Sequence, residues 1–248
     1  MERQTLARRL YWVPAKPCNG AFVDIAAITF DLDDTLWPIA PTIREAEREL
    51  HAWFARHAPK IARQFSLEDL GRLREEIGRE RRDIAHDLSA LRLASLERAA
   101  RMAGEPPQVA RQAFQVFYAA RNRVRFYPDV GTALPALAAS RPLAALTNGN
   151  ACLRRTGADR WLNFSISARE VGAPKPDAAM FDAAAHRLGL APERILHVGD
   201  DPEHDGRGAR AAGYQSVLID RDRRFGAELD GIPVIRHLEE LTARLAVD

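Results

Sequence analysis

Two short acidic segments, far apart in the chain, contain the residues best suited to chemistry. The first is Asp31-Leu32-Asp33-Asp34-Thr35, after an apolar run that starts at Ile25, and the second is Gly199-Asp200-Asp201, followed by Asp205. Each lies where a buried parallel strand would end, which is where ligands bind in open α/β sheets. Carboxylates gathered there cannot all stay ionised without a cation, because each raises the pKa of its neighbours. The pattern therefore predicts a hard divalent metal held by oxygen ligands, and a metal-dependent enzyme.

From residue 25 onward the chain alternates apolar strands with helical segments, a pattern typical of a parallel sheet. Strands are predicted at Ile25–Phe30, Leu143–Leu146, Phe164–Ser167, Ile195–Val198, Ser216–Ile219 and Pro233–Ile235. Helices are predicted between or after them, at Gly131–Ala139, Asp177–Leu188, His204–Ala212 and Leu238–Leu245. The predicted fold class is therefore α/β, with a Rossmann-like parallel sheet as its core.

One long interval interrupts this alternation. Residues 31 to 147 separate the first two predicted strands, whereas a strand–helix–strand unit needs only about 30 residues. Within the interval, apolar residues recur at helical spacing in four stretches, around Leu50, Leu73, Leu91 and Phe117. We expect a four-helix domain at 38–126, inserted into a core formed by 25–37 and 127–248, with 1–24 as an N-terminal tail. Because the insert starts directly after the first acidic segment, we expect it to cover that segment as a cap.

Composition argues against several functional classes. The 248 residues include 36 Lys and Arg against 34 Asp and Glu, a formal charge of +2 that is too balanced to favour nucleic acid or membrane binding. No apolar run approaches the about 18 residues of a membrane-spanning helix, and the first residues lack the apolar core of a signal peptide. Two cysteines, Cys18 and Cys152, are too few for a disulfide framework. We expect a protein of the reducing cytoplasm, and the sequence predicts no particular oligomeric state.

Four motifs follow the ends of successive predicted strands. They are Asp31-x-Asp33-x-Thr35, Leu146-Thr147-Asn148-Gly149, Lys175 between two prolines, and Gly199-Asp200-Asp201 with Asp205. In order and in residue type these motifs resemble those of the haloacid dehalogenase-like hydrolase superfamily, and the resemblance covers residues 25–248. It implies a Mg²⁺-dependent phosphatase that acts on a small-molecule phosphate ester, with a helical cap between the first and second motifs.

The resemblance also implies a role for each motif residue. Asp31 would be the nucleophile that forms an aspartyl phosphate, and Asp33 would act as general acid and then general base. Mg²⁺ would be held by Asp31, Asp200 and the backbone carbonyl of Asp33. The phosphate would be bound by Thr147, Asn148 and Lys175, the lysine compensating the charge that develops beside Asp31.

The remaining acids next to these motifs have less specific expected roles. Asp34 is expected to cap a turn or a helix. Asp201 would either bind the metal or support a ligand from behind. Asp205 is expected to orient Lys175 or a metal-bound water rather than to contact the metal itself.

Asp33 distinguishes the branches of the superfamily. An alkoxide leaving group needs a proton from a general acid, whereas a halide does not, so this residue favours phosphate-ester hydrolysis over dehalogenation. Two alternatives stay open. A phosphomutase would share both aspartates and differ only in excluding water, and a binding module would hold a phosphorylated ligand without turnover.

The predicted cap should select the substrate. His86 and Arg92 flank the expected start of one of its helices, in the stretch His86-Asp87-Leu88-Ser89-Ala90-Leu91-Arg92, and both are candidates to face the cleft. Together with Trp37 and Thr147-Asn148-Gly149-Asn150, this stretch resembles bacterial phosphatases active on flavin mononucleotide and on 5-amino-6-(5-phosphoribitylamino)uracil, a riboflavin precursor. The alternative for His86 is an ordinary capping or solvated residue.

Overall fold

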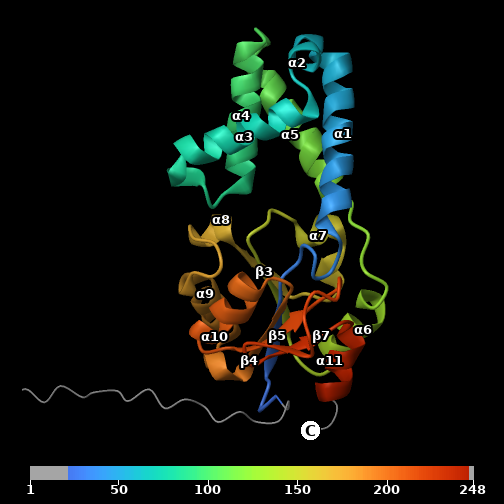
Figure 1. The fold of residues 1–248 in the computed structure, drawn as a ribbon, viewed down its shortest axis with the longest axis vertical. Helices are drawn as coiled ribbons and strands as arrows, with labels where there is room; N and C mark the ends of the chain where they lie inside the picture. The colour runs from blue at the N-terminus through green and yellow to red at the C-terminus, as the bar shows by residue number, and fades with distance from the viewer. Residues whose placement is uncertain (1–21, 246–248) are drawn as a thin grey trace, which may run out of the picture.

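A seven-stranded sheet forms the base of the molecule, and a group of long helices stands beyond its upper edge in the view of Figure 1. The computed structural model describes residues 22–245, so Cys18 and most of the predicted tail lie outside the described part. The strands are β1 (Ala27–Phe30), β2 (Leu143–Thr147), β3 (Phe164–Ser167), β4 (Ile195–Gly199), β5 (Gln215–Ile219), β6 (Glu228–Leu229) and β7 (Ile232–Ile235). Their order is β3-β2-β1-β4-β5-β7-β6, and every neighbouring pair is parallel except β6 with β7.

The two central strands bring the acidic segments together. β1 and β4 pair with Thr29 opposite His197 and Phe30 opposite Val198. The backbone N–H of Asp31 still donates to the carbonyl of Val198, at 2.9 Å, so the ladder continues to the end of both strands. Parallel pairing in this register therefore places both acidic segments at one edge of the sheet.

Helices cover both faces of the sheet, as a parallel sheet requires. On one face α6 (Val130–Ala138) and α11 (Leu238–Leu245) pack on the alternate residues of β1, β2 and β4 that include Phe30 and Val198. On the other face lie α9 (Ala178–Leu188) and α10 (Gly208–Ala211), with Phe181 and Ala209 in their core. Short elements complete this part: α7 (Leu153–Thr156), α8 (Ala168–Val171), the 3₁₀ turns η2 (Ala158–Arg160) and η3 (Pro192–Arg194), and the π-helical turn η4 (Pro202–Arg207).

The helices between β1 and β2 form a second core of their own. They are α1 (Ile39–His57), α2 (Pro59–Gln64), α3 (Leu67–Glu80), the 3₁₀ turn η1 (Arg82–Ile84), α4 (Leu88–Met102) and α5 (Gln108–Arg121). Leu50, Phe54 and Phe117 are almost completely buried in that core. Local signals set the helix starts, since Ser66 and Asp69 form a reciprocal capping box at α3 and Asp87 caps α4.

The predicted fold class is confirmed. All six predicted strands and all four helices predicted between residues 38 and 126 are present, and the structure adds β6 and the short α2, α7 and α8. These additions are too short to produce a readable periodicity. The predicted helix over His204–Ala212 is instead split between η4 and α10. Within residues 22–245 no helix is both long and apolar enough to cross a membrane.

Candidate active site

Lys175 connects the acidic segments at the edge of the sheet. Its ammonium nitrogen, Nζ, lies 2.7 Å from Asp31 Oδ1, 2.6 Å from Asp205 Oδ1 and 2.7 Å from the carbonyl oxygen of Leu146. These three acceptors satisfy the three N–H donors of the ammonium group. Since Lys175 is only 2 % exposed, its charge is fixed in place and directed at Asp31.

The loop that carries Lys175 is held by the turn that follows β2. Asn148 Oδ1 accepts from the backbone N–H of Lys175 at 2.7 Å, and Asn148 Nδ2 donates to its backbone carbonyl at 3.0 Å. Thr147 is buried beside it, and its hydroxyl accepts from the N–H of Gly149 at 2.9 Å. The structure thus brings Thr147 and Asn148, like the third predicted phosphate ligand Lys175, to the site, but it uses the side chain of Asn148 to fix the lysine loop.

The carboxylates of the site respond differently to their surroundings. Burial raises the pKa of Asp31, and its neighbours Asp205 and Asp200 raise it further against the opposing effect of Lys175. Burial, together with Asp205 and Asp34, raises the pKa of Asp200 to about 7. Burial alone would also raise the pKa of Asp205, but Lys175 and the hydrogen bond from His197 outweigh it and hold that pKa well below its usual range. For Asp31 and Asp200, the positive charge that the protein places nearby is therefore too small to offset the effect of burial on the pKa.

The donor set at this edge fits a divalent cation. Asp31, Asp200 and Asp205 each offer an oxygen, and these atoms lie within 4.8 Å of one another. Three ionised carboxylates against one ammonium leave two negative charges, which a divalent ion would balance. Hard oxygen donors suit Mg²⁺. Both oxygens of Asp205 are already engaged, Oδ1 by Lys175 and Oδ2 by the N–H of Asp201, whereas Lys175 contacts only Oδ1 of Asp31. Asp31 and Asp200 are therefore the side chains better placed to hold the ion.

Asp201 and Asp205 support the turn after β4. Asp201 Oδ1 accepts from the backbone N–H groups of Glu203 and His204, both at 2.8 Å, and so caps η4. Asp205 Oδ2 accepts from the N–H of Asp201 at 3.1 Å. The chain can fold back this closely only because residue 199 is glycine, since a Cβ there would lie 2.2 Å from Asp205 Cγ.

Asp33 is held by partners that the sequence analysis did not assign. Trp37 Nε1 donates to Asp33 Oδ1 at 2.8 Å, and Arg121 Nη2 contacts Oδ1 and Oδ2 at 3.0 and 2.7 Å. Gly149 leaves space for the carboxylate, because a Cβ there would lie 2.6 Å from Asp33 Oδ2. The nearby Asp34 caps α1 as expected, accepting from the N–H of Ile39 at 2.9 Å.

Arg121 ties the helices of residues 39–121 to the acidic edge. It is the last residue of α5 and is 1 % exposed, and its Nε donates to Asn150 Oδ1 at 2.7 Å. Asn150 Nδ2 in turn donates to Ser89 Oγ of α4 at 3.1 Å. No local sequence signal identifies Arg121, because its partners come from segments distant in the chain. A basic residue at the end of a helix is ordinarily explained by the helix dipole alone.

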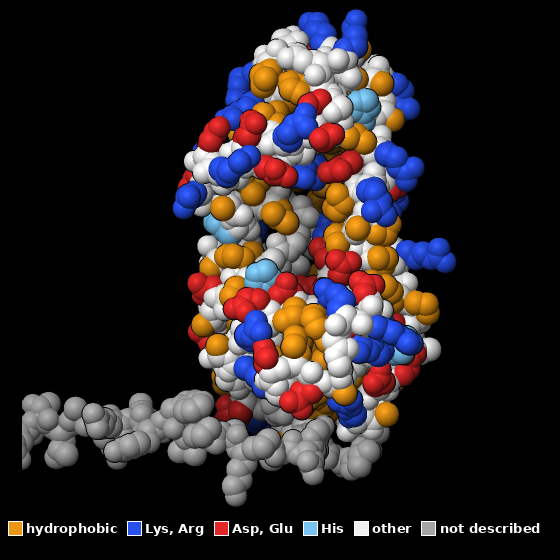
Figure 2. Space-filling view, viewed as in Figure 1, with side chains coloured by type: hydrophobic (Ala, Val, Ile, Leu, Met, Phe, Trp, Pro, Cys, Tyr) orange, Lys and Arg blue, Asp and Glu red, His pale blue; other side chains and the backbone are white. Residues whose placement is uncertain are grey.

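A cleft lies between the helical part and the sheet, and the space-filling view shows the molecule hollowed there (Figure 2). It has a volume of about 350 Å³ and runs beside the turn that holds Gly149 and Asn150. Its other lining residues are mostly polar: His86, Asp87, Leu88, Ser89, Tyr118, Ala151, Cys152, Ser165, Ser167, Arg169 and Glu170. The structure thus brings His86 to the cleft. It places Arg92 inside the helical core instead, paired with Glu47 at 3.3 Å and stacked over the ring of Phe117.

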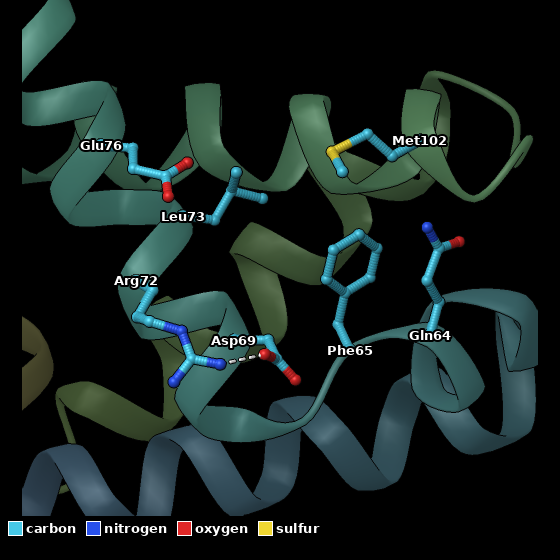
Figure 3. A pocket seen from close by; sticks show the side chains of 7 residues that line it. All are labelled: Gln64, Phe65, Asp69, Arg72, Leu73, Glu76 and Met102. Carbon is cyan, nitrogen blue, oxygen red and sulfur yellow. Dashed lines mark hydrogen bonds and ion pairs between the residues drawn. The ribbon is translucent and has the colours of Figure 1, made fainter.

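Another pocket, of about 250 Å³, lies wholly within the helical part (Figure 3). Arg72 and Asp69 of α3 form an ion pair at its wall, and Met102 lines it from the end of α4. The remaining lining residues are Gln64, Phe65, Leu73 and Glu76. None of the predicted site residues lines this pocket, so the site remains at the sheet edge.

Comparison with known proteins agrees with this geometry. Residues 25–213 match the family model described as haloacid dehalogenase-like hydrolase. The chain is 36 % identical over 199 residues to the 5-amino-6-(5-phospho-D-ribitylamino)uracil phosphatase YigB of Escherichia coli, covering 79 % of this chain and 83 % of that protein. It is 31 % identical over 212 residues to a glyceraldehyde 3-phosphate phosphatase of Methanopyrus kandleri, covering 80 % and 85 %.

Solved structures share the fold. A crystal structure described as a 2-haloacid dehalogenase from Pseudomonas syringae superposes with a TM-score of 0.83 at 36 % identity, over 90 % of this chain and 98 % of that one. A HAD-hydrolase of Bacillus subtilis, YfnB, described as bound to magnesium, superposes with a TM-score of 0.65 at 18 % identity, over 91 % and 100 %. The second likeness concerns the fold alone.

Proposed function

The chain belongs to the haloacid dehalogenase-like hydrolases, and from this membership we propose that it is a Mg²⁺-dependent phosphomonoesterase acting on a small phosphorylated metabolite. The observation that carries the proposal is the buried contact of Lys175 with Asp31, with Asp33 two residues beyond. This arrangement supplies a nucleophile, a fixed positive charge beside it and a separate carboxyl group for proton transfer.

In the first step Asp31 attacks phosphorus and forms an aspartyl phosphate while the bond to the ester oxygen breaks. Asp33 gives its proton to the departing alkoxide. The hydroxyl of Thr147 binds a phosphoryl oxygen, and the positive charge of Lys175 beside Asp31 offsets the negative charge that increases in the transition state. Trp37 and Arg121 keep the Asp33 carboxyl group directed at the leaving oxygen.

In the second step Asp33 takes a proton from water, which attacks the acyl phosphate and releases inorganic phosphate. Asp31 returns to its carboxylate form and the protons balance over the two steps. Mg²⁺, held by Asp31, Asp200 and the backbone carbonyl of Asp33, would supply the positive charge that lets a carboxylate approach a phosphate dianion.

The cleft beside Gly149 takes the rest of the substrate. Its histidine, tyrosine, serine, arginine and glutamate side chains suit a leaving group rich in hydroxyl and amide groups rather than an apolar one. The 36 % identity to the E. coli enzyme makes 5-amino-6-(5-phospho-D-ribitylamino)uracil the first substrate to assay. Flavin mononucleotide, which the resemblance of the sequence motifs also suggests, is the second.

The function is tested by release of phosphate from p-nitrophenyl phosphate. Asp31→Asn removes the nucleophile and should lower kcat by at least about 10³-fold while the protein stays folded. EDTA should abolish activity in the unchanged protein and added Mg²⁺ should restore it. Asp159→Asn, at an exposed aspartate, is the matched control and should keep full activity. Full turnover by Asp31→Asn, or hydrolysis that is indifferent to metal, would refute the proposal.

Dehalogenation is the second candidate, favoured by the TM-score of 0.83 to the Pseudomonas syringae structure. The same protein should therefore be assayed for chloride release from 2-chloropropionate. The phosphatase proposal expects phosphate release and no chloride release. Product analysis also excludes or establishes a phosphomutase, which would leave phosphate on a new hydroxyl instead of releasing it.

A further inference from the structure

A polar row crosses the middle of the sheet, where a parallel sheet is otherwise apolar. Thr29 of β1 and His197 of β4 lie opposite each other in register, and both are 0 % exposed. Neither has a part in the reaction described above. Burying a histidine in a central strand costs free energy unless its ring nitrogens find partners, so the partners indicate what the residue does.

Both ring nitrogens of His197 are satisfied, and chemistry fixes the direction of each hydrogen bond. Nε2 lies 3.1 Å from Asp205 Oδ1, and an ionised carboxylate can only accept, so Nε2 carries the proton. Burial lowers the pKa of His197, which favours the neutral ring. In a neutral ring whose proton is on Nε2, Nδ1 is the acceptor, and the hydroxyl of Thr29, whose Oγ1 lies 2.9 Å away, can donate to it.

The same oxygen of Asp205 that accepts from His197 also accepts from Lys175, at 2.6 Å. Its other oxygen is held by the N–H of Asp201. The position of Asp205 Oδ1 thus decides where the ammonium group of Lys175 lies, and Lys175 in turn lies 2.7 Å from Asp31. A continuous series of hydrogen bonds runs from the centre of the sheet to the nucleophile.

We propose that Thr29 and His197 are positioning residues, which act through Asp205 to hold Lys175 against Asp31. The proposal rests on the proposed function for its kinetic consequence, but its structural content stands on the hydrogen bonds alone. Thr29 determines the tautomer of His197, and His197 determines the orientation of the Asp205 carboxylate. That carboxylate in turn determines the position of the Lys175 ammonium group. Neither residue touches the substrate.

The competing explanation is simple packing, because the His197 ring also meets the ring of Phe181 edge-on, with centroids 5.5 Å apart. The two explanations differ in which substitutions restore activity. A packing role needs volume, whereas a positioning role needs an N–H donor aimed at Asp205.

The experiment compares four variants in the phosphate-release assay. His197→Met keeps volume but removes the donor, and should lower kcat about 10- to 100-fold with little change in KM. His197→Gln keeps an N–H at the end of the side chain and should recover most of that loss. Thr29→Val removes the hydroxyl at constant shape and should lower kcat severalfold, whereas Thr29→Ser, which keeps it, should not.

A double-mutant cycle then tests whether Thr29 acts through His197. Thr29→Val should have no further effect in the His197→Met background, because the residue that it orients is already lost. The matched control is Ser216→Ala. Ser216 pairs with His197 from β5 and is buried, but its hydroxyl has no hydrogen-bond partner among the described residues, so kcat should not change.

Two kinetic outcomes would overturn the proposal: equal activity of the Gln and Met variants, or additive effects of Thr29→Val and His197→Met. If the unchanged protein releases no phosphate, the proposed function fails, but crystal structures still test this inference. The structures needed are those of Thr29→Val, His197→Gln and, where it folds, His197→Met. Lys175 Nζ should move away from Asp31 in the Met variant and stay in place in the Gln variant. The inference would be refuted if Lys175 did not move in the His197→Met variant. It would also be refuted if the His197 ring and Asp205 kept their positions in the Thr29→Val variant.

Discussion

At the scale of single residues, the site depends on charges and hydrogen bonds that leave little room for adjustment. Lys175 has all three N–H donors occupied, and Asp33 receives hydrogen bonds on both carboxylate oxygens. Gly149 lets the carboxylate of Asp33 approach the backbone more closely than any side chain would allow, and Gly199 does the same for Asp205. The identity of a residue at this edge is thus set as much by space as by chemistry.

The role of Asp33 predicts a dependence on the leaving group. Asp33→Asn should slow the first chemical step about 100-fold or more for an alkyl phosphate, whose alkoxide needs a proton. The same step should change far less for p-nitrophenyl phosphate, whose leaving group departs without one. Rapid-quench measurement of the first turnover separates this step from the hydrolysis of the intermediate. Equal losses for both esters would show that Asp33 is not the acid.

The close approach at Gly199 predicts a loss of both stability and activity on adding one methyl group. The Cβ of Gly199→Ala would overlap Asp205, which must move and so release Lys175. Activity should fall with KM and kcat both affected, and the melting temperature should drop. Gly71→Ala in α3 is the control: a Cβ there meets nothing within 4 Å, so it should keep activity and raise stability by about 0.4–1 kcal/mol. Full activity of Gly199→Ala would mean that the turn relaxes without cost.

At the scale of elements, the helices of residues 39–121 contact the acidic edge of the sheet directly. α5 ends in Arg121, which contacts Asp33, and α4 begins near Ser89, which binds Asn150. The general acid and the turn after β2 are therefore held by the inserted helices, and movement of those helices would alter the acid directly. The domain boundaries at residues 37 and 126 stay predictions, but this contact gives the predicted cap a chemical consequence.

Arg121→Gln tests that consequence. The change leaves the half-buried Asp33 carboxylate without its charged partner and should lower kcat/KM about 10- to 100-fold, since general acid–base catalysis contributes on that scale or more. Arg123→Gln, two residues on, breaks only an exposed pair with Glu49 and should change kcat/KM less than about twofold. Similar kinetics of the two variants would show that Arg121 does not position the Asp33 carboxylate for catalysis.

At the scale of the whole molecule, one buried residue of the central sheet, His197, affects stability as well as the proposed catalysis. His197 is completely buried among β1, β4 and α9, and Phe181, Thr29, Asp205 and Lys175 face it. Burial lowers the pKa of His197 below its ordinary value of 6.5, with Lys175 acting in the same direction and Asp205 opposing it. Folding therefore holds this ring neutral under conditions where the unfolded chain would protonate it.

This predicts a dependence of stability on pH. Below pH 6.5 the unfolded state binds a proton that the folded state does not, so for this group the free energy of unfolding rises as pH increases toward 6.5 and is constant above it. The slope that it contributes is at most about 1.4 kcal/mol per pH unit. His197→Gln should remove this contribution, measured as the difference between urea-unfolding profiles of the two proteins over pH 5 to 8. His186→Gln, at an exposed histidine of α9, is the control, and parallel profiles for His197→Gln and the unchanged protein would refute the prediction.

The amino-acid sequence by itself determined the strands, the main helices and the edge at which the acidic segments meet. Apolar runs and capping residues act over a few neighbouring positions, so Asp31 after β1 and Gly199 at the end of β4 could be placed from local patterns. The parallel pairing of those strands follows from the alternation of strand and helix. The family was likewise recognisable, because its motifs are short and lie at strand ends.

Only the tertiary structure decided which side chains meet across that edge. Arg121 reaches Asp33 from the end of α5, and His197 reaches Asp205 across the turn after β4, through hydrogen bonds whose direction and length depend on packing. Arg92, expected at the cleft, turns into the helical core because Glu47 and Phe117 lie there. Partners distant in sequence leave no periodic trace in either segment, so their meeting is a property of the folded chain alone.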